Sequence, residues 1–110
     1  MDDALLISHV ERFNRAVGTG YFGPMIAAFA PTAEMVFEGV TAGPFVDRQA
    51  ISDAYARQPP TDEVRLLGSP RSEDGAIVAD YAWAGDERRA GRMILTARDG
   101  MITRLIVTVE

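Results

Sequence analysis

The chain of 110 residues contains no cysteine and no lysine, and it has one histidine, His9, and one tryptophan, Trp83. Without cysteine it can form no disulfide, no thiolate nucleophile and no thiolate metal site. All eleven cationic side chains are arginines, which excludes Schiff-base and lysine-base mechanisms. There is also no HExxH motif, no paired-aspartate spacing and no phosphate loop with its lysine. We therefore expect neither a metal nor another cofactor.

Positive charge and long apolar runs are also scarce. The net charge of −5 disfavours a nucleic-acid partner, because phosphate binding requires clustered cations. The apolar run Ala4–Ile7 is too short for a signal-peptide core, and no membrane-length segment follows it. We expect a cytoplasmic soluble protein without a membrane partner. With 47% hydrophobic and 25% charged residues, a single domain over residues 1–110 is predicted.

The first half of the chain has helical apolar spacing with one strand inserted. Leu6, Val10 and Phe13 follow the helical period, and prolines and glycines separate the segments. The predicted elements are a helix over 3–17, a short helix from Pro24 that Pro31 ends, a strand over 35–40, and a helix from the capping residue Asp47 to Pro59-Pro60.

The second half reads as strands. The predicted segments are 63–68, 76–84, 88–97 and 101–109, with the Asp99-Gly100 pair as the clearest hairpin turn. Successive hairpins give an antiparallel meander, which the early strand must join to satisfy its backbone groups. The predicted fold class is therefore α+β.

The last strand is apolar on both of its alternating faces. Ile102 and Ile106 fall on one face, and Leu105, Val107 and Val109 fall on the other. One face can cover the helices, while the other is left for a partner. Exposed apolar sheet surface usually marks an interface, so we expect a homodimer formed through the sheet.

This order of elements resembles the nuclear transport factor 2-like superfamily, in particular its SnoaL-like and ketosteroid-isomerase-like branch. The resemblance covers nearly the whole chain, and its best local carriers are the segments FAPTAEMVFEG, FVDRQAISDAY and DGMITRL. It implies a cone-shaped α+β barrel, in which a curved mixed or antiparallel sheet wraps around the N-terminal helices. It also implies an interior pocket for a small hydrophobic molecule, although such a fold does not define a reaction.

The ketosteroid isomerase pattern gives a residue-level comparison. Its general-base aspartate falls on Glu38 when counted back from the third helix, and on Phe37 when counted forward from Phe29. One residue of difference moves a strand side chain to the other face. The positions that match its two oxyanion donors are Phe13, which has no hydroxyl, and the neighbourhood of Arg92. Ordinary ketosteroid isomerase chemistry is therefore not expected, because that reaction depends on those donors.

Three side chains are candidate acid–base groups. Glu38 is either a pocket base, whose pKa desolvation would raise, or a strand-end acid in solvent or paired with an arginine. His9 lies one helical turn from Phe13 and so borders the apolar face of its helix. Asp80 points away from Tyr81 and Trp83 on an alternating strand, so either Asp80 or that aromatic pair lies inside the cone.

The leading hypothesis is a domain that binds a small hydrophobic molecule and carries a cofactor-free acid–base site of the isomerase, cyclase or hydrolase kind. Glu38 or Asp80 would act as the base, and His9 or a tyrosine as the donor. The alternative is a noncatalytic ligand-binding or dimerisation module. The residues expected to contact the ligand are Phe13, Tyr21, Phe29, Tyr55, Tyr81 and Trp83.

Overall fold

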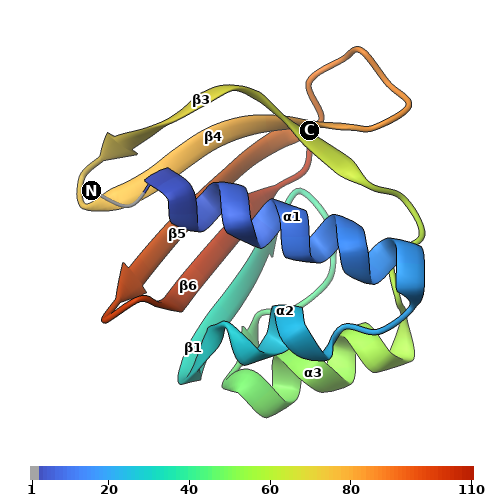
Figure 1. Cartoon of the computed structure of the whole chain (residues 1–110), viewed down its shortest axis with the longest axis vertical. Helices are drawn as coiled ribbons and strands as arrows, with labels where there is room; N and C mark the ends of the chain where they lie inside the picture. Colours follow the sequence, from blue (N-terminus) through green and yellow to red (C-terminus); the bar gives the residue numbers. More distant parts are fainter. Residues whose placement is uncertain (1–2) are drawn as a thin grey trace.

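Three helices pack inside the curve of one sheet in the computed structural model, which describes residues 3–110 (Figure 1). In chain order the elements of this range are α1 (Asp3–Thr19), α2 (Gly23–Ala27), β1 (Phe29–Glu38), β2 (Phe45–Val46), α3 (Arg48–Arg57), β3 (Val64–Glu73), β4 (Ala76–Trp83), β5 (Gly91–Arg98) and β6 (Met101–Thr108). Within the same residues, no helix is both long enough and apolar enough to cross a membrane.

The six strands form one mixed sheet in the order β2-β1-β6-β5-β4-β3. Strands β3 to β6 are the antiparallel meander that the turn signals predict. Strand β1 joins it in parallel beside β6, and the two-residue β2 pairs with the other side of β1. The sheet curves around the helices but is not closed, so β2 and β3 remain its edges. The predicted α+β cone is confirmed.

Strand β1 begins six residues earlier than predicted, at Phe29 instead of Met35. The prediction was wrong because Pro31 was taken as the end of a helix and not as part of a strand. The register between β1 and β6 is irregular between Phe29 and Glu34. Proline is tolerated in such an irregular stretch, because no ladder hydrogen bond depends on its missing N–H.

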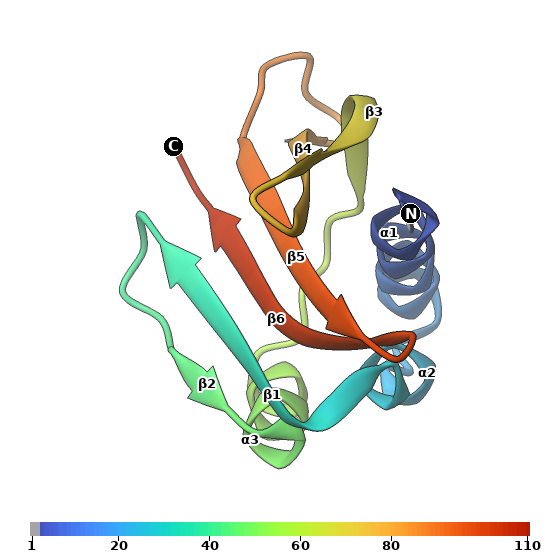
Figure 2. The ribbon, with the colours of Figure 1, turned by 90° about the vertical axis from the view of Figure 1, so that its left-hand side faces the viewer.

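Helices α1 and α3 bury the apolar faces that their sequences predict, and α3 also has its predicted cap. The Asp47 carboxylate accepts a hydrogen bond from the Ala50 N–H at 2.8 Å and so caps α3. Leu6 and Val10 of α1 and Ile51 of α3 are buried against the sheet. These contacts bring α1 and α3 to opposite ends of the concave face, which Figure 2 shows from the side.

The inner face of the sheet supplies most of the core. Tyr81 of β4, Leu95 of β5 and Leu105 of β6 are almost completely buried there. Ile102 is buried in the same cluster, so the prediction that it shares a face with Ile106 was wrong. A register shift next to Ala97 in the pairing of β5 and β6 breaks the simple alternation at this point.

No helix of residues 3–110 covers the outer face of the sheet (Figure 2). Val36, Ile106 and Ile94 lie opposite one another on β1, β6 and β5 and form an apolar stripe across its middle. All three side chains are half-buried. An ion pair between Glu34 and Arg104, with Oε1 and Nε 3.2 Å apart, borders the stripe on one side.

Candidate functional site

A cavity of about 180 Å³ lies between α1, α3 and the concave face of the sheet. Its wall is mostly apolar and aromatic, and no arginine, aspartate or glutamate among the described residues lines it. The residues that line it are His9, Phe13, Met35, Phe37, Tyr55, Gln58, Pro60, Val64, Tyr81, Trp83, Met93, Leu105 and Val107. A concave apolar site with few polar groups is the usual form of a small-molecule site.

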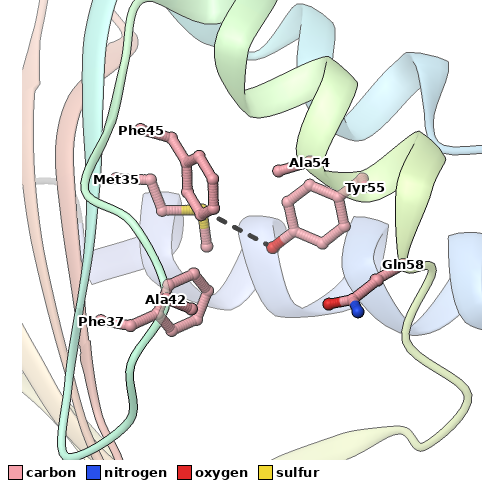
Figure 3. Close-up of a pocket in the computed structure, with 7 residues that line it drawn as sticks. All are labelled: Met35, Phe37, Ala42, Phe45, Ala54, Tyr55 and Gln58. Atoms are coloured by element: carbon pink, nitrogen blue, oxygen red, sulfur yellow. Dashed lines mark hydrogen bonds between the residues drawn. The ribbon is translucent and has the colours of Figure 1, made fainter.

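A second hollow of about 140 Å³ adjoins this cavity on the side of β2. The two spaces share Met35, Phe37, Tyr55 and Gln58 as lining residues. Figure 3 shows Tyr55 of α3 facing Met35 of β1 across this hollow, with the hydroxyl 3.7 Å from the Met35 sulfur. Both side chains line both spaces, and a thioether sulfur is only a weak hydrogen-bond acceptor.

Among the described residues that line the cavity, His9 is the one ionisable base. Its side chain is 2% exposed, and its ring meets Phe29 edge to face with the centroids 5.8 Å apart. Burial, and secondarily the charge of Arg12, lowers the pKa of His9 from 6.5 to about 4. The imidazole is therefore neutral at pH 7. Its Nδ1 atom is buried and has no hydrogen-bond partner within residues 3–110.

The two cavity tyrosines differ in how their hydroxyls are held. The Tyr81 hydroxyl donates to the Thr108 carbonyl oxygen at 3.0 Å, whereas the Tyr55 hydroxyl makes the weaker contact to the Met35 sulfur. Burial raises the pKa of Tyr55, and burial followed by the charge of Glu110 raises the pKa of Tyr81. Both phenols therefore stay protonated at neutral pH. Of the two, Tyr55 has the greater capacity to contact a ligand.

Five of the predicted site residues come together at this cavity: His9, Phe13, Tyr55, Tyr81 and Trp83. The open question about strand β4 is resolved, because Tyr81 and Trp83 face inward and pack edge to face with their centroids 6.1 Å apart. Trp83 is 38% exposed and lies at the rim.

The two candidate carboxylates lie outside the cavity. Glu38 is exposed at the end of β1, while its neighbour Phe37 lines the wall, so the inward position holds a phenyl ring and not an acid. Asp80 is on the outer face, 3.2 Å from Nε of both Arg89 and Arg92. Partial burial raises the pKa of Asp80, but hydrogen bonds and charges from the two arginines outweigh this effect and hold the pKa below its ordinary value.

Two of the predicted ligand contacts also lie elsewhere. Phe29 is completely buried behind His9, and Tyr21 is 70% exposed in a surface hollow beside α2. Sequence reasoning missed Met35, Met93 and Leu105 as lining residues. Their alternation on strands was the available signal, but it required knowing which face is inward. Within residues 3–110, no group of three or more His, Asp or Glu side chains is placed to hold a metal ion.

Comparison with known proteins gives a structural likeness only. No family model matches the sequence, and no curated protein does. An NTF-2-like protein of unknown function from Burkholderia xenovorans LB400 is 12% identical and has a TM-score of 0.69, with 100% of this chain and 88% of the other covered.

Two further solved structures extend this likeness. A protein with a ketosteroid isomerase-like fold from Catenulispora acidiphila DSM 44928, in complex with trimethylamine, has a TM-score of 0.68 and 15% identity, with 90% of this chain and 82% of the other covered. A candidate SnoaL-like polyketide cyclase from Jannaschia sp. CCS1 has a TM-score of 0.66 and 12% identity, with 94% and 84% covered. The chain therefore has the nuclear transport factor 2-like fold, and its structural neighbours include ketosteroid-isomerase-like and SnoaL-like proteins.

Proposed function

We propose that the chain binds a small hydrophobic molecule in the cavity lined by His9. The observation that carries this proposal is an apolar space of about 180 Å³ bordered by a buried histidine whose Nδ1 atom has no partner among the described residues. An apolar cavity of about 150 Å³ is large enough to hold benzene. A single-ring molecule is therefore the appropriate size class.

The same cavity is our proposed place for cofactor-free acid–base chemistry of the isomerase, cyclase or hydrolase kind. Glu38 and Asp80 lie outside it, so His9 is the base and Tyr55 is the donor in this version of the proposal. The pKa of His9, lowered to about 4, leaves the imidazole free to accept a proton but makes it a weak base at neutral pH. Binding is therefore the function that the geometry supports best.

The binding proposal is tested by titrating the protein with single-ring apolar compounds. Trp83 is the sole tryptophan and lies at the rim, so its fluorescence should change as the cavity fills. At a ligand concentration of 100 times Kd, the fold should gain about 2.7 kcal/mol, measured as a rise in Tm.

A matched pair of variants locates the binding site. Val107→Phe fills the cavity and should abolish the fluorescence change and the rise in Tm. Val46→Phe makes the same substitution at an exposed position of β2 and should leave both intact. Failure of every compound in the panel to bind the unmodified protein would contradict the proposal.

The second candidate is a noncatalytic dimerisation module that uses the outer face of the sheet. The stripe of Val36, Ile94 and Ile106 supports it, because the three residues are paired across neighbouring strands and none of the three described helices covers them. A second copy of the chain could bury this stripe by a two-fold related contact, in which the same patch serves both partners.

For this candidate we expect two chains per particle by light scattering at micromolar concentration, and one chain for Ile94→Glu. The charge would be buried without a partner in the interface, which strongly opposes association. Ile7→Glu introduces the same side chain at an exposed position of α1 and should leave the dimer intact. A monomeric unmodified protein would remove this candidate.

A further inference from the structure

His9 is the polar group of the cavity that most needs a partner. Among the other polar side chains of the wall, Tyr81 is bonded to Thr108, Tyr55 contacts the Met35 sulfur, and Gln58 is exposed at the end of α3. By comparison, His9 is 2% exposed, and its Nδ1 atom has no partner within the described residues. Buried polar atoms without a partner are rare, and each one calls for an explanation.

The cavity disfavours a charged ligand. No Asp, Glu or Arg side chain of the part that the structure describes is on its wall, so a bound carboxylate or ammonium would lose its hydration without gaining an opposite charge. The same burial keeps the His9 imidazole uncharged at pH 7. A neutral imidazole has one N–H donor and one nitrogen acceptor. A neutral hydroxyl group can donate to the acceptor or accept from the N–H, whichever ring nitrogen faces the cavity.

The remaining wall fixes the shape of the rest of the ligand. Phe13 of α1, Phe37 of β1 and Trp83 of β4 bring aromatic surface to the cavity from three different elements. Aromatic side chains pack well against a flat ring through offset-stacked or edge-to-face contacts. The volume of about 180 Å³ limits the ligand to one ring with small substituents.

We propose that the cavity selects a neutral single-ring molecule of the phenol type, whose hydroxyl group bonds to the imidazole of His9 while its ring packs among Phe13, Phe37 and Trp83. This inference rests on the proposed binding function and adds to it a ligand class and a specificity-determining residue. His9 would distinguish a hydroxylated ring from an apolar ring of the same shape.

The test compares phenol with toluene, which has nearly the same shape but a methyl group in place of the hydroxyl. Dissociation constants are measured for both compounds with the unmodified protein and with His9→Leu. Leucine removes both ring nitrogens and keeps the wall apolar. We expect His9→Leu to weaken phenol binding relative to toluene binding by about tenfold or more, because the ligand hydroxyl would be buried without a partner.

Nuclear magnetic resonance gives a second readout that does not depend on a variant. His9 is the only histidine, so the ¹⁵N signals of its ring can be assigned without ambiguity. Saturation with phenol should shift a ring nitrogen signal in the direction of hydrogen bonding, whereas saturation with toluene should not.

The possible outcomes separate this inference from the function on which it rests. If toluene and phenol both bind, but His9→Leu leaves their ratio unchanged and the ring nitrogens do not respond to phenol, the His9 anchor is overturned and ligand binding stands. If neither compound binds and other single-ring compounds also fail, the proposed function and the inference are both overturned.

Discussion

Replacing Phe29 by alanine is expected to lower the free energy of unfolding by about 3–5 kcal/mol, the usual cost of deleting a buried phenyl ring. Phe29 is completely inaccessible to solvent, and its ring meets the His9 ring edge to face. Its loss removes apolar burial and leaves a void that the surrounding core can fill only in part. Denaturant unfolding with an unchanged m value would measure the loss as a change in stability.

Phe13→Ala is the matched control, since it deletes the same ring from a half-buried position on the wall of an existing cavity. We expect Phe13→Ala to lower the free energy of unfolding by less than half of the amount that Phe29→Ala lowers it. It should also weaken the binding of single-ring ligands. Equal losses at the two positions would contradict the assignment of Phe29 to the core and of Phe13 to the cavity wall.

Stability is expected to fall by as much as about 3 kcal/mol as the pH is lowered from 6.5 to 4, because His9 must stay neutral in the folded chain. The unfolded chain binds a proton at His9 near the ordinary pKa of 6.5, whereas burial and the charge of Arg12 lower the folded pKa to about 4. Between these values the unfolded state holds more protons, so acid favours unfolding. The contribution of the neutral His9 to stability is fully present above pH 6.5 and is lost as the pH falls from 6.5 to about 4.

His9→Leu provides the control, because a leucine has no proton to gain. Its stability should be nearly flat between pH 6.5 and 4, measured by denaturant unfolding at each pH. In Asp80→Asn the free energy of unfolding should depend on pH between 6.5 and 4 as it does in the unmodified protein. The pKa of Asp80 is lowered from 3.8, so the contribution of Asp80 is present above that value and is lost only at lower pH. If the stability of His9→Leu falls with pH as steeply as that of the unmodified protein, His9 is not the group that causes the fall.

The fold could be predicted from local signals because most of them agree with one another. The Asp47 cap, the Asp99-Gly100 turn and the apolar period of the first helix each predict the element that forms. The errors lie where a single residue overrides the pattern. Strand β1 accommodates Pro31 because its register with β6 is irregular there. The register shift between β5 and β6 next to Ala97 directs Ile102 into the core.

The site was harder to predict because it depends on which side of each strand faces inward. The alternation of side chains placed Asp80 and Tyr81 on different faces of β4, but it could not show which of the two faces is inside the cone. Phe37 and Glu38 are separated by one position, and the pairing of Phe37 with Val107 that sets their directions lies across the sheet. The isolation of the His9 ring likewise depends on Phe29, which packs against it from another element.

The two edges of the sheet limit how this chain can associate with others. Strand β2 at one edge is two residues long, and β3 at the other edge is interrupted by a bulge between Leu67 and Arg71 that contains Pro70. An added strand needs an unbroken row of free N–H and C=O groups, which neither edge provides. Growth of the sheet by strand addition, as in a fibril, is therefore blocked at both ends, and this open sheet stays finite without closing into a barrel.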